Sequence, residues 1–314
     1  MKLKFLIVFF SFFISFNSST SPIGFTSEEE LIHNGISRKF ILHTPGSFSE
    51  NRPLVFVVHG YTSSAQNIMN YSSMNSIADR EGFAVVYPQG TTDTSGNTFF
   101  NVGYDFNVNS KVDDEGFFRQ IVKSLISSHE INPKNIFIAG MSNGGDMSYM
   151  MACNASDIFS AIASVTGVMM KDITDNCIPE ILIPILEIHG TKDRISSYYG
   201  DLENEGGWGS YYGIEFSTKF WVDINSLSKK ETLNLRDLNK NDGSTVTFNK
   251  YWDKNTNIEV WLYTINGGGH TWPGVDFGFK WWRNPYLWFL MGRSNLDINA
   301  SEEIWKFFEK YIEE

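Results

Sequence analysis

The chain has 314 residues, a formal net charge of −11 and only two cysteines. A surface this acidic repels phosphate backbones and anionic membrane faces, so nucleic acid is not an expected partner. Neither cysteine has the spacing or the partners of a metal site. The sequence therefore implies no metal and no cofactor.

The N-terminus has the layout of a secretory signal peptide. A short basic start precedes an apolar run from Phe5 to Phe16, and small polar residues follow. The run is too short to span a bilayer, although a short buried helix or a retained N-terminal anchor is the alternative. No linker or repeat divides the rest. We expect residues 1–21 to be a signal peptide, residues 22–314 to form a single domain, and the mature chain to be extracellular or periplasmic without a stable membrane anchor.

Apolar runs alternate with helical patterns along this domain. It opens with an expected hairpin around Asn34-Gly35, since this dipeptide tolerates positive φ. Six apolar runs are typical of strands buried on both faces of a mostly parallel sheet: 54–58, 83–87, 136–139, 162–165, 185–188 and 261–265. Helical patterns occupy 65–80, 113–125, 143–152 and 299–311. The alternation predicts an α/β sandwich with helices on both faces of the sheet, and chemistry gathers after the carboxyl ends of such strands.

The segment Gly140-Met-Ser-Asn-Gly144 matches the pattern G-x-S-x-G between a predicted strand and a predicted helix. A sharp strand-to-helix turn strains the backbone of the central serine, and the residues two before and two after it must lack bulk. The turn also points the first amides of the helix at a developing oxyanion. We predict that Ser142 is the nucleophile of an α/β-hydrolase. An ordinary glycine-rich turn is the alternative.

A serine hydroxyl needs an imidazole to take its proton, and the imidazole needs a carboxylate to fix its tautomer. In this fold the acid and then the histidine follow the serine along the chain. His270, in the glycine-rich segment 267–274, is the only histidine after a plausible acid loop. Asp193 is the predicted acid. Its rivals are Asp172, Asp175, Glu187 and Asp201.

Main-chain N–H groups are expected to stabilise the oxyanion. They belong to Asn143, after the nucleophile, and to Tyr61, in the loop after the first buried central strand. Tyr61 and Trp272 are also candidate walls of the substrate pocket. His59 and His189 each end a strand just before a glycine. We expect these two histidines to hydrogen-bond to loop backbone, and the alternative is that they line the active-site floor.

The two cysteines, Cys153 and Cys177, are 24 residues apart. In an exported protein they could form one disulfide, which would add about 3 kcal/mol of stability in the chain-entropy model. Two buried free thiols are the alternative, and the bridge is the expected state.

Five segments together carry a family resemblance: HGYTSSA (59–65), DDEGFF (113–118), GMSNGG (140–145), HGTKD (189–193) and GGGHTWPG (267–274). From about Gly35 to the C-terminal helix, the chain resembles the secreted polyhydroxybutyrate depolymerase-like and feruloyl esterase-like α/β-hydrolases, including the LpqC-type esterases. The resemblance implies a serine esterase with Ser142, Asp193 and His270 as its triad, the same residues that the motifs predict.

The resemblance also implies a substrate class. Expected substrates are esters of a polymer or its fragments, cleaved through an acyl-enzyme, with removal of feruloyl or acetyl groups from plant polysaccharide as the alternative. A serine peptidase or an acyltransferase would use the same triad. The intact order of serine, aspartate and histidine argues against a non-catalytic binding module.

The chain departs from the family in three places. Asp146 stands where relatives usually carry an uncharged residue; near a helix start a carboxylate is favourable, so we expect it to be structural, although it could alter the pocket. Ser226 replaces a frequent cysteine, which removes a second disulfide. An aromatic-rich insert, 277–289, follows the predicted catalytic histidine. Its side chains either border the active-site mouth or pack against the protein, and the natural substrate stays open.

Overall fold

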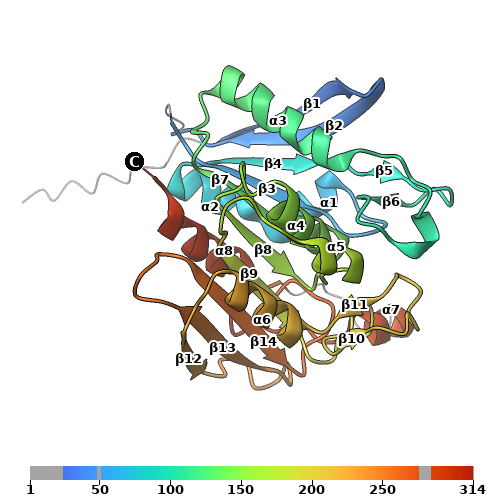
Figure 1. Cartoon of the computed structure of the whole chain (residues 1–314), viewed down its shortest axis with the longest axis vertical. Coiled ribbons are helices and arrows are strands. Elements are labelled where there is room, and N and C mark those ends of the chain that lie inside the picture. The colour runs from blue at the N-terminus through green and yellow to red at the C-terminus, as the bar shows by residue number, and fades with distance from the viewer. Residues whose placement is uncertain (1–23, 48–50, 276–283, 314) are drawn as a thin grey trace, which may run out of the picture.

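The computed structural model of the chain describes residues 24–47, 51–275 and 284–313. The predicted signal peptide, residues 1–21, and residues 277–283 of the aromatic insert lie outside these ranges. A ten-stranded sheet crosses the molecule in the order β1-β2-β4-β3-β7-β8-β9-β14-β13-β12. Helices cover both of its faces (Figure 1). The predicted fold class, a mostly parallel α/β sandwich, is confirmed.

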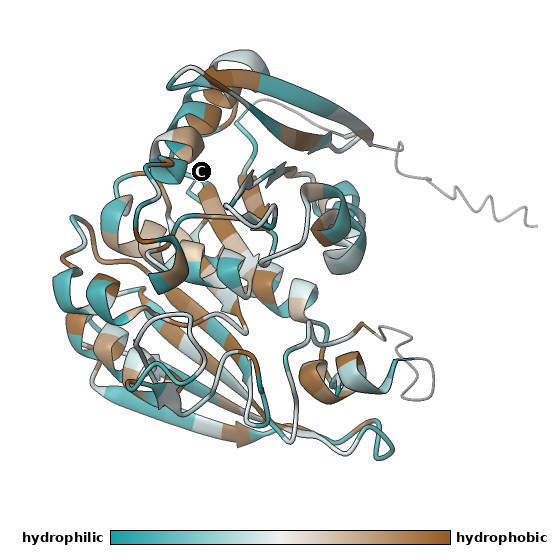
Figure 2. Cartoon of the chain, turned by 90° about the vertical axis from the view of Figure 1, so that its right-hand side faces the viewer, coloured by the Kyte–Doolittle hydropathy of each residue, from teal (hydrophilic) through white to brown (hydrophobic). Residues whose placement is uncertain are grey.

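The centre of the sheet is parallel and fully buried. Its five inner strands have no exposed residue, which explains why each reads as a continuous apolar run rather than an alternating one. Figure 2 shows hydrophobic segments on strands in the interior of the molecule as well as on the helices around them. The parallel strands are β3 (Leu54–Val58), β4 (Ala84–Pro88), β7 (Ile136–Met141), β8 (Ala161–Val165), β9 (Ile185–Gly190) and β14 (Glu259–Asn266).

Antiparallel strands extend the sheet at both ends. At one end the predicted hairpin turns at Asn34 and Gly35, which both have positive φ, 49° and 78°. At the other end, the sheet continues beyond β14 with two strands that were not predicted from the sequence. These outer strands are β1 (Phe25–His33), β2 (Ile36–Thr44), β12 (Lys229–Asn234) and β13 (Thr245–Trp252). Two short ribbons lie outside the sheet: β5 (Thr91–Thr92) with β6 (Thr98–Phe99), and β10 (Gly200–Asp201) with β11 (Tyr211–Tyr212).

The helix predicted over 65–80 is two helices. Ser73 has a φ of 53° and its N–H bonds to the carbonyl oxygen of Met69 at 3.2 Å. One residue in the left-handed region cannot continue a right-handed helix, so α1 ends there and α2 begins. The helices are α1 (Ala65–Ser72), α2 (Met74–Glu81), α3 (Asp114–His129), α4 (Asn143–Asn154), α5 (Lys171–Asn176), α6 (Ile214–Ile224), α7 (Pro285–Met291) and α8 (Ala300–Phe308).

Each face of the sheet has its own apolar core. Because side chains alternate along a strand, Phe56 of β3 packs into one core and Val57 into the other. The first core includes Trp221 of α6 and side chains of α3 and α4, and the second includes Trp305 of α8 and side chains of α1 and α2. The central strands are thereby held rigidly between two layers of helices.

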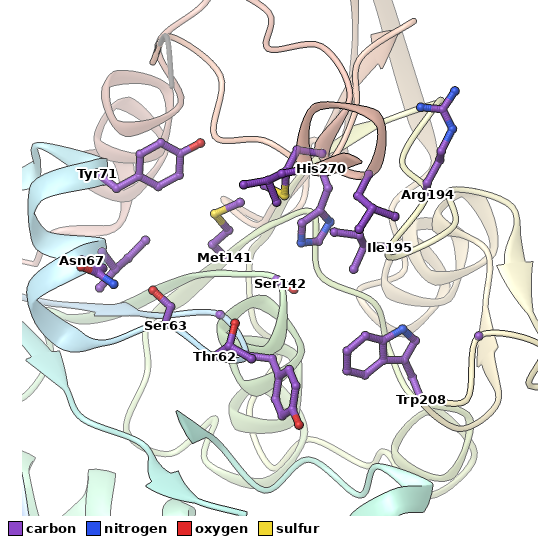
Figure 3. Close-up of a pocket in the computed structure, with 17 residues that line it drawn as sticks. Thr62, Ser63, Asn67, Tyr71, Met141, Ser142, Arg194, Ile195, Trp208 and His270 are labelled. Atoms are coloured by element: carbon purple, nitrogen blue, oxygen red, sulfur yellow. The ribbon is translucent and has the colours of Figure 1, made fainter. Parts of the chain in front are cut away.

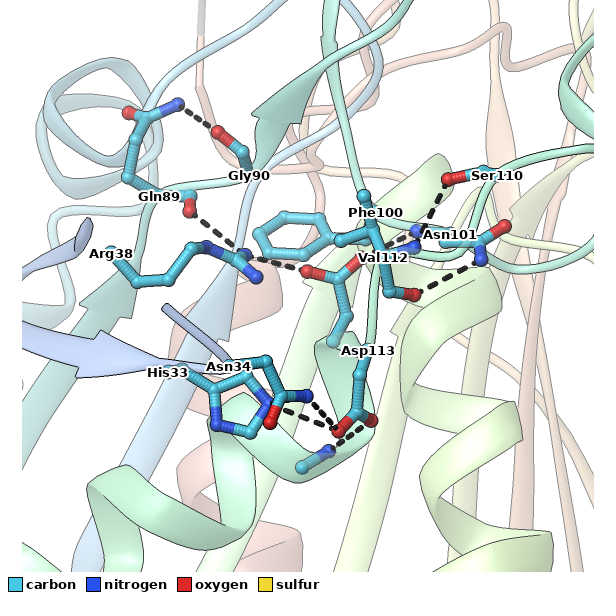
Figure 4. Close-up of polar contacts among 12 residues, drawn as sticks. His33, Asn34, Arg38, Gln89, Gly90, Phe100, Asn101, Ser110, Val112 and Asp113 are labelled. Atoms are coloured by element: carbon cyan, nitrogen blue, oxygen red, sulfur yellow. Dashed lines mark hydrogen bonds and ion pairs between the residues drawn. The ribbon is translucent and has the colours of Figure 1, made fainter. Parts of the chain in front are cut away.

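A buried ion pair ties the β1–β2 hairpin to α3 (Figure 4). The Arg38 guanidinium lies 2.5 Å from the Asp114 carboxylate, and both side chains are almost completely buried. The other carboxylate oxygen of Asp114 accepts the Asn101 main-chain N–H at 2.7 Å. The preceding residue, Asp113, caps α3 by accepting the N–H of Gly116. The DDEGFF segment thus connects the β1–β2 hairpin to the start of α3.

Cys153 at the end of α4 and Cys177 after α5 form a disulfide. The bridge connects the helix that follows Ser142 to a surface loop. Among the helices of the described ranges, none combines the length and the apolar character that a membrane span requires.

Candidate active site

Ser142 occupies a strained turn between β7 and α4. Its φ of 54° and ψ of −123° lie outside the regions that side-chain-bearing residues normally adopt. Close packing of glycines holds this conformation. A Cβ at Gly140 would lie 2.0 Å from the Gly144 carbonyl oxygen, and a Cβ at Gly144 would lie 2.2 Å from the Val58 carbonyl oxygen. Only glycine fits at either position, which is the steric reason for the G-x-S-x-G spacing.

His270 and Asp193 meet although 77 residues separate them. Their loops follow β14 and β9, which are neighbours in the sheet and parallel. The His270 Nδ1 lies 2.7 Å from the Asp193 Oδ2, and both residues are buried. The other carboxylate oxygen of Asp193 accepts the main-chain N–H groups of Ile195 and Ser196, each at 2.8 Å. These bonds fix the orientation of the carboxylate, which in turn sets the imidazole tautomer.

The Asp193 carboxyl is stabilised as an anion. Burial alone would raise its pKa, but the charge of His270 and hydrogen bonds from His189 and His270 bring the pKa of Asp193 below its ordinary value. The carboxylate therefore stays ionised at neutral pH, and His270 keeps its Nδ1 proton directed at it. The Nε2 of His270 is left to accept a proton.

The rival acids have other partners. Asp201 accepts the main-chain N–H groups of Glu205 and Gly206 within its own loop. Asp175 pairs with Lys171 and Tyr212, and Asp172 lies beside it on α5. Glu187 is buried on β9, where its carboxylate contacts Tyr149 and His189. Within the described ranges, His270 has a hydrogen bond to Asp193 and to none of the four rivals.

The two predicted oxyanion donors lie beside the nucleophile. A Cβ at Gly60 would be only 3.2 Å from the Cβ of Ser142, so the loop of Tyr61 packs directly against the serine. The main-chain N–H groups of Tyr61 and Asn143 make no hydrogen bond to any residue of the described ranges. Side chains hold both segments: the Tyr61 hydroxyl donates to Asp93 at 2.6 Å, and the Asn143 amide bonds to both main-chain groups of Phe100. Both N–H groups are thus available to a ligand.

Ser142 and His270 line one pocket of about 790 Å³. Figure 3 shows His270 next to Ser142, with Trp208 and Ile195 on one side of the cavity and Asn67 and Tyr71 on the other. Most of the remaining lining is apolar. It comprises Tyr61, Ile68, Met141, Leu287, Leu290 and Met291, together with smaller or polar residues. Such a surface suits an apolar acyl or alcohol group.

Two pocket predictions have different outcomes. Tyr61 lines the pocket as expected. Trp272 does not: its side chain is completely buried in the core under α8, and its indole N–H donates to the Ser301 hydroxyl at 3.0 Å. The prediction of a Trp272 wall is wrong, because closeness to His270 along the chain does not set the direction of the side chain. Trp208 forms an aromatic wall instead, and no sequence motif marks it.

The described part of the aromatic insert borders the pocket. On α7, Leu287, Leu290 and Met291 face the cavity, whereas Tyr286 and Phe289 are exposed. The guanidinium of Arg194, on the loop of Asp193, stacks over the Phe289 ring at 4.2 Å. Within 284–289, Leu287 thus borders the pocket, whereas the aromatic side chains of this stretch do not line it. The other residues of the insert lie outside the described ranges.

Asp146, in the first turn of α4, is buried behind the nucleophile. Its carboxylate accepts the Tyr104 hydroxyl at 2.5 Å and the Val168 N–H at 2.6 Å. Burial raises the pKa of Asp146 to about 7, and the two hydrogen bonds oppose this rise. These contacts join α4 to its neighbours. No group of three or more metal-binding side chains lies together in the part of the chain that the structure describes.

Comparison with known proteins gives this site its context. Residues 38–179 match the model of the esterase PHB depolymerase family. Feruloyl esterase B of Piromyces equi is 29% identical over 74% of this chain and 42% of its own length. Poly(3-hydroxyalkanoate) depolymerase C of Paucimonas lemoignei is 25% identical over 83% of this chain and 64% of its own. The chain thus spans less than two thirds of either relative.

The fold has solved counterparts. The acetyl xylan esterase from Aspergillus awamori superposes with a TM-score of 0.55 at 14% identity, covering 85% of this chain and 100% of that one. This likeness concerns the architecture alone. The sequence matches confirm the resemblance that the motifs indicated, and the structural likeness supports the fold: the chain is a serine esterase of the α/β-hydrolase fold, similar in sequence to polyhydroxybutyrate depolymerases and feruloyl esterases.

Proposed function

We propose that this esterase works through Ser142 as nucleophile, His270 as general base and Asp193 as the acid that orients it. One observation carries the assignment: the serine and the histidine line the same pocket, and a buried carboxylate holds the other ring nitrogen of the histidine. The strained backbone of Ser142 supports it independently, because strain of this kind persists where function requires it.

The reaction is a two-step acyl transfer. The Ser142 Oγ attacks the ester carbonyl carbon while the His270 Nε2 takes the hydroxyl proton. The main-chain N–H groups of Tyr61 and Asn143 bind the oxyanion of the tetrahedral intermediate. The intermediate collapses as the imidazolium returns the proton to the leaving alcohol, and an acyl-enzyme forms. Water, deprotonated by the same imidazole, then attacks the acyl carbon and releases the acid and the free serine.

The proposed substrate is an ester of a polymer or of its oligomeric fragments. The apolar walls of the pocket and its size fit a chain of short aliphatic hydroxyacids such as a polyhydroxyalkanoate. A feruloyl ester of plant polysaccharide is the second candidate, because Tyr61, Tyr71 and Trp208 offer aromatic surfaces for a planar acyl group. We further propose that residues 1–21 direct export and that residues 22–314 act as one domain outside the cytoplasm.

A substrate panel tests the proposal. The purified chain is assayed with p-nitrophenyl acetate, methyl ferulate, polyhydroxybutyrate film and a peptide amide, beside a Ser142→Ala variant. We expect ester turnover by the wild type. The variant should lose about six orders of magnitude in kcat, because it lacks the hydroxyl that His270 activates, and it should melt like the wild type. Turnover of the peptide alone, or an active alanine variant, would contradict the proposal.

A further inference from the structure

The Asp193 carboxylate faces two imidazoles, of which the reaction uses one. Its Oδ2 lies 2.7 Å from the Nδ1 of His270 and 3.4 Å from the Nε2 of His189. His189 is completely buried on β9 and does not line the pocket. His189 therefore contacts the proposed acid from the protein interior and not from the substrate pocket.

Both ring nitrogens of His189 face oxygen atoms that accept hydrogen bonds. Nδ1 lies 2.9 Å from the Oε1 of Glu187, and Nε2 lies 2.8 Å from the main-chain carbonyl oxygen of Ser196 in addition to Asp193. A neutral imidazole donates from one nitrogen only, so its other nitrogen would direct a lone pair at an oxygen. The second oxygen of Glu187 accepts the Tyr149 hydroxyl at 2.9 Å, which suits a carboxylate. Burial raises the pKa of Glu187, and hydrogen bonds from His189 and Tyr149 oppose this rise. With Glu187 as a carboxylate, the geometry fits a proton on each nitrogen of His189.

The charges around His189 agree with this assignment. Burial alone would lower its pKa, but hydrogen bonds to Asp193 and Glu187 raise the pKa of His189 to about 10. The other titratable groups that face this region are Asp146 and Tyr149 from α4, Tyr198 from the loop after β9, and His270. Glu187 and Asp193 are the two anions that contact the ring directly.

We propose that His189 is a positioning residue of this esterase: a permanently protonated imidazole, held between Glu187 and Asp193, that keeps Asp193 ionised and aimed at His270. The proposal rests on the triad proposed above. The His189 cation balances part of the Asp193 charge and so limits how strongly Asp193 stabilises the His270 imidazolium. Glu187 supplies part of the counter-charge of this cation, and Asp193 and the Ser196 carbonyl oxygen hold its other nitrogen.

His59 provides a matched control within the same chain. It is also completely buried and also precedes a glycine at a strand end. Its Nδ1 donates to the Gly60 carbonyl oxygen at 2.8 Å, and its Nε2 accepts the Gly90 main-chain N–H at 3.0 Å. One donor and one acceptor define a single neutral tautomer.

The protonation state is tested by nitrogen NMR of the full chain with ¹⁵N-labelled histidines at neutral pH. We expect two protonated ring nitrogens at His189, and one protonated and one bare nitrogen at His59. His189→Gln and His59→Gln variants assign the signals. A bare nitrogen at His189 would overturn the proposal, and this result does not depend on whether the enzyme is active.

The positioning role is tested by the pH dependence of kcat/KM, whose acidic limb reports the base of the free enzyme. His189→Gln removes a positive charge near His270, so we expect the limb to move to higher pH by about one unit and kcat to fall with little change in KM. Glu187→Gln leaves that charge unbalanced, and the limb should move to lower pH. Loosened packing cannot move the limb in opposite directions. Shifts of the same sign, or none, would refute the role even where activity falls.

These outcomes separate the two proposals. If Ser142→Ala abolishes turnover while the pH limbs of the two variants do not move, the triad stands and the role of His189 fails. If the alanine variant is active, the proposed function fails whatever the limbs do. Should His189→Gln not fold, the Glu187→Gln profile and the NMR spectrum of the wild type still decide.

Discussion

A His-Gly pair follows β3 and another ends β9, two strands of the parallel sheet, and the surroundings of the two histidines are electrostatic opposites. The Nδ1 of His59 faces the Gly60 carbonyl oxygen, its Nε2 faces the Gly90 main-chain N–H and the Gln89 side-chain amide, and burial lowers the pKa of His59 to about 4. The β9 loop surrounds His189 with two carboxylates and a carbonyl oxygen. The same dipeptide is therefore neutral in one loop and protonated in the other.

The difference teaches that the partners of a buried imidazole set its charge, and the residue type does not. It also divides the site. In the proposed mechanism the β3 loop supplies the uncharged main-chain N–H of Tyr61 beside Ser142, whereas the β9 loop supplies the Asp193 carboxylate that orients His270. Because β7 lies next to β3 and two strands from β9, the serine stands between a neutral loop and a charged loop.

The largest effect is expected on the charged side. Asp193→Asn should lower kcat by about four orders of magnitude, because an amide donates to Nδ1 and imposes the wrong tautomer on His270. Asp201→Asn, on the same loop but bonded within it, is the control and should keep nearly full activity. If the two variants exchanged these outcomes in steady-state kinetics, Asp201 would be the acid.

The two histidines should affect stability on opposite sides of neutrality. The folded pKa of His59 is lowered to about 4, so its contribution is present above an unfolded pKa of about 6.5 and is lost as pH falls towards 4, up to about 3 kcal/mol. The pKa of His189 is raised to about 10, so its contribution is present below about 6.5 and is lost as pH rises towards 10.

Urea denaturation across pH measures both contributions. His59→Gln should flatten the acidic side of the stability profile, and His189→Gln should flatten the alkaline side. If both variants flattened the same side, the contrast between the two loops would be wrong.

A smaller effect is expected from a substitution in the loop after β3, at Gly60. Gly60→Ala would place a Cβ 3.2 Å from the Ser142 Cβ and 3.4 Å from the Met141 carbonyl oxygen. A shift of a few tenths of an ångström is then needed, which moves the Tyr61 N–H relative to the oxyanion. We expect kcat to fall about tenfold with KM nearly constant. An unchanged kcat would show that this loop does not hold the oxyanion, and the Gly35→Ala hairpin variant controls for a general loss of stability.

Much of this molecule could be predicted because its signals are local. Strands buried on both faces read as apolar runs, and the strained turn at Ser142 requires glycines at fixed distances. The order of serine, aspartate and histidine then narrows the acid and base to residues at neighbouring strand ends. Each of these features depends on the backbone or on sequence order.

The remaining features depend on contacts that the sequence does not display. The edge strand β12 has exposed side chains throughout and shows no apolar alternation. Trp208 and Trp272 are both tryptophans near the site, and only tertiary packing sends the first to the pocket and the second to the core. His59 and His189 read alike as histidines bonded to loop backbone. For His189 that description is incomplete, because Glu187 and Asp193 contact it too.

Part of the pocket wall comes from α1, from the segment before β11 and from α7, and none of these belongs to the central sheet. Substitutions at Leu287 or Leu290 of α7, or at Trp208, which also packs against Tyr61, would therefore leave the central strands themselves unchanged. A combinatorial library at these three positions would change which acyl and alcohol groups the pocket accepts while the reacting groups stay the same. Because the sheet carries the reacting groups and other segments form part of the pocket wall, substrate preference can change while the reaction stays the same.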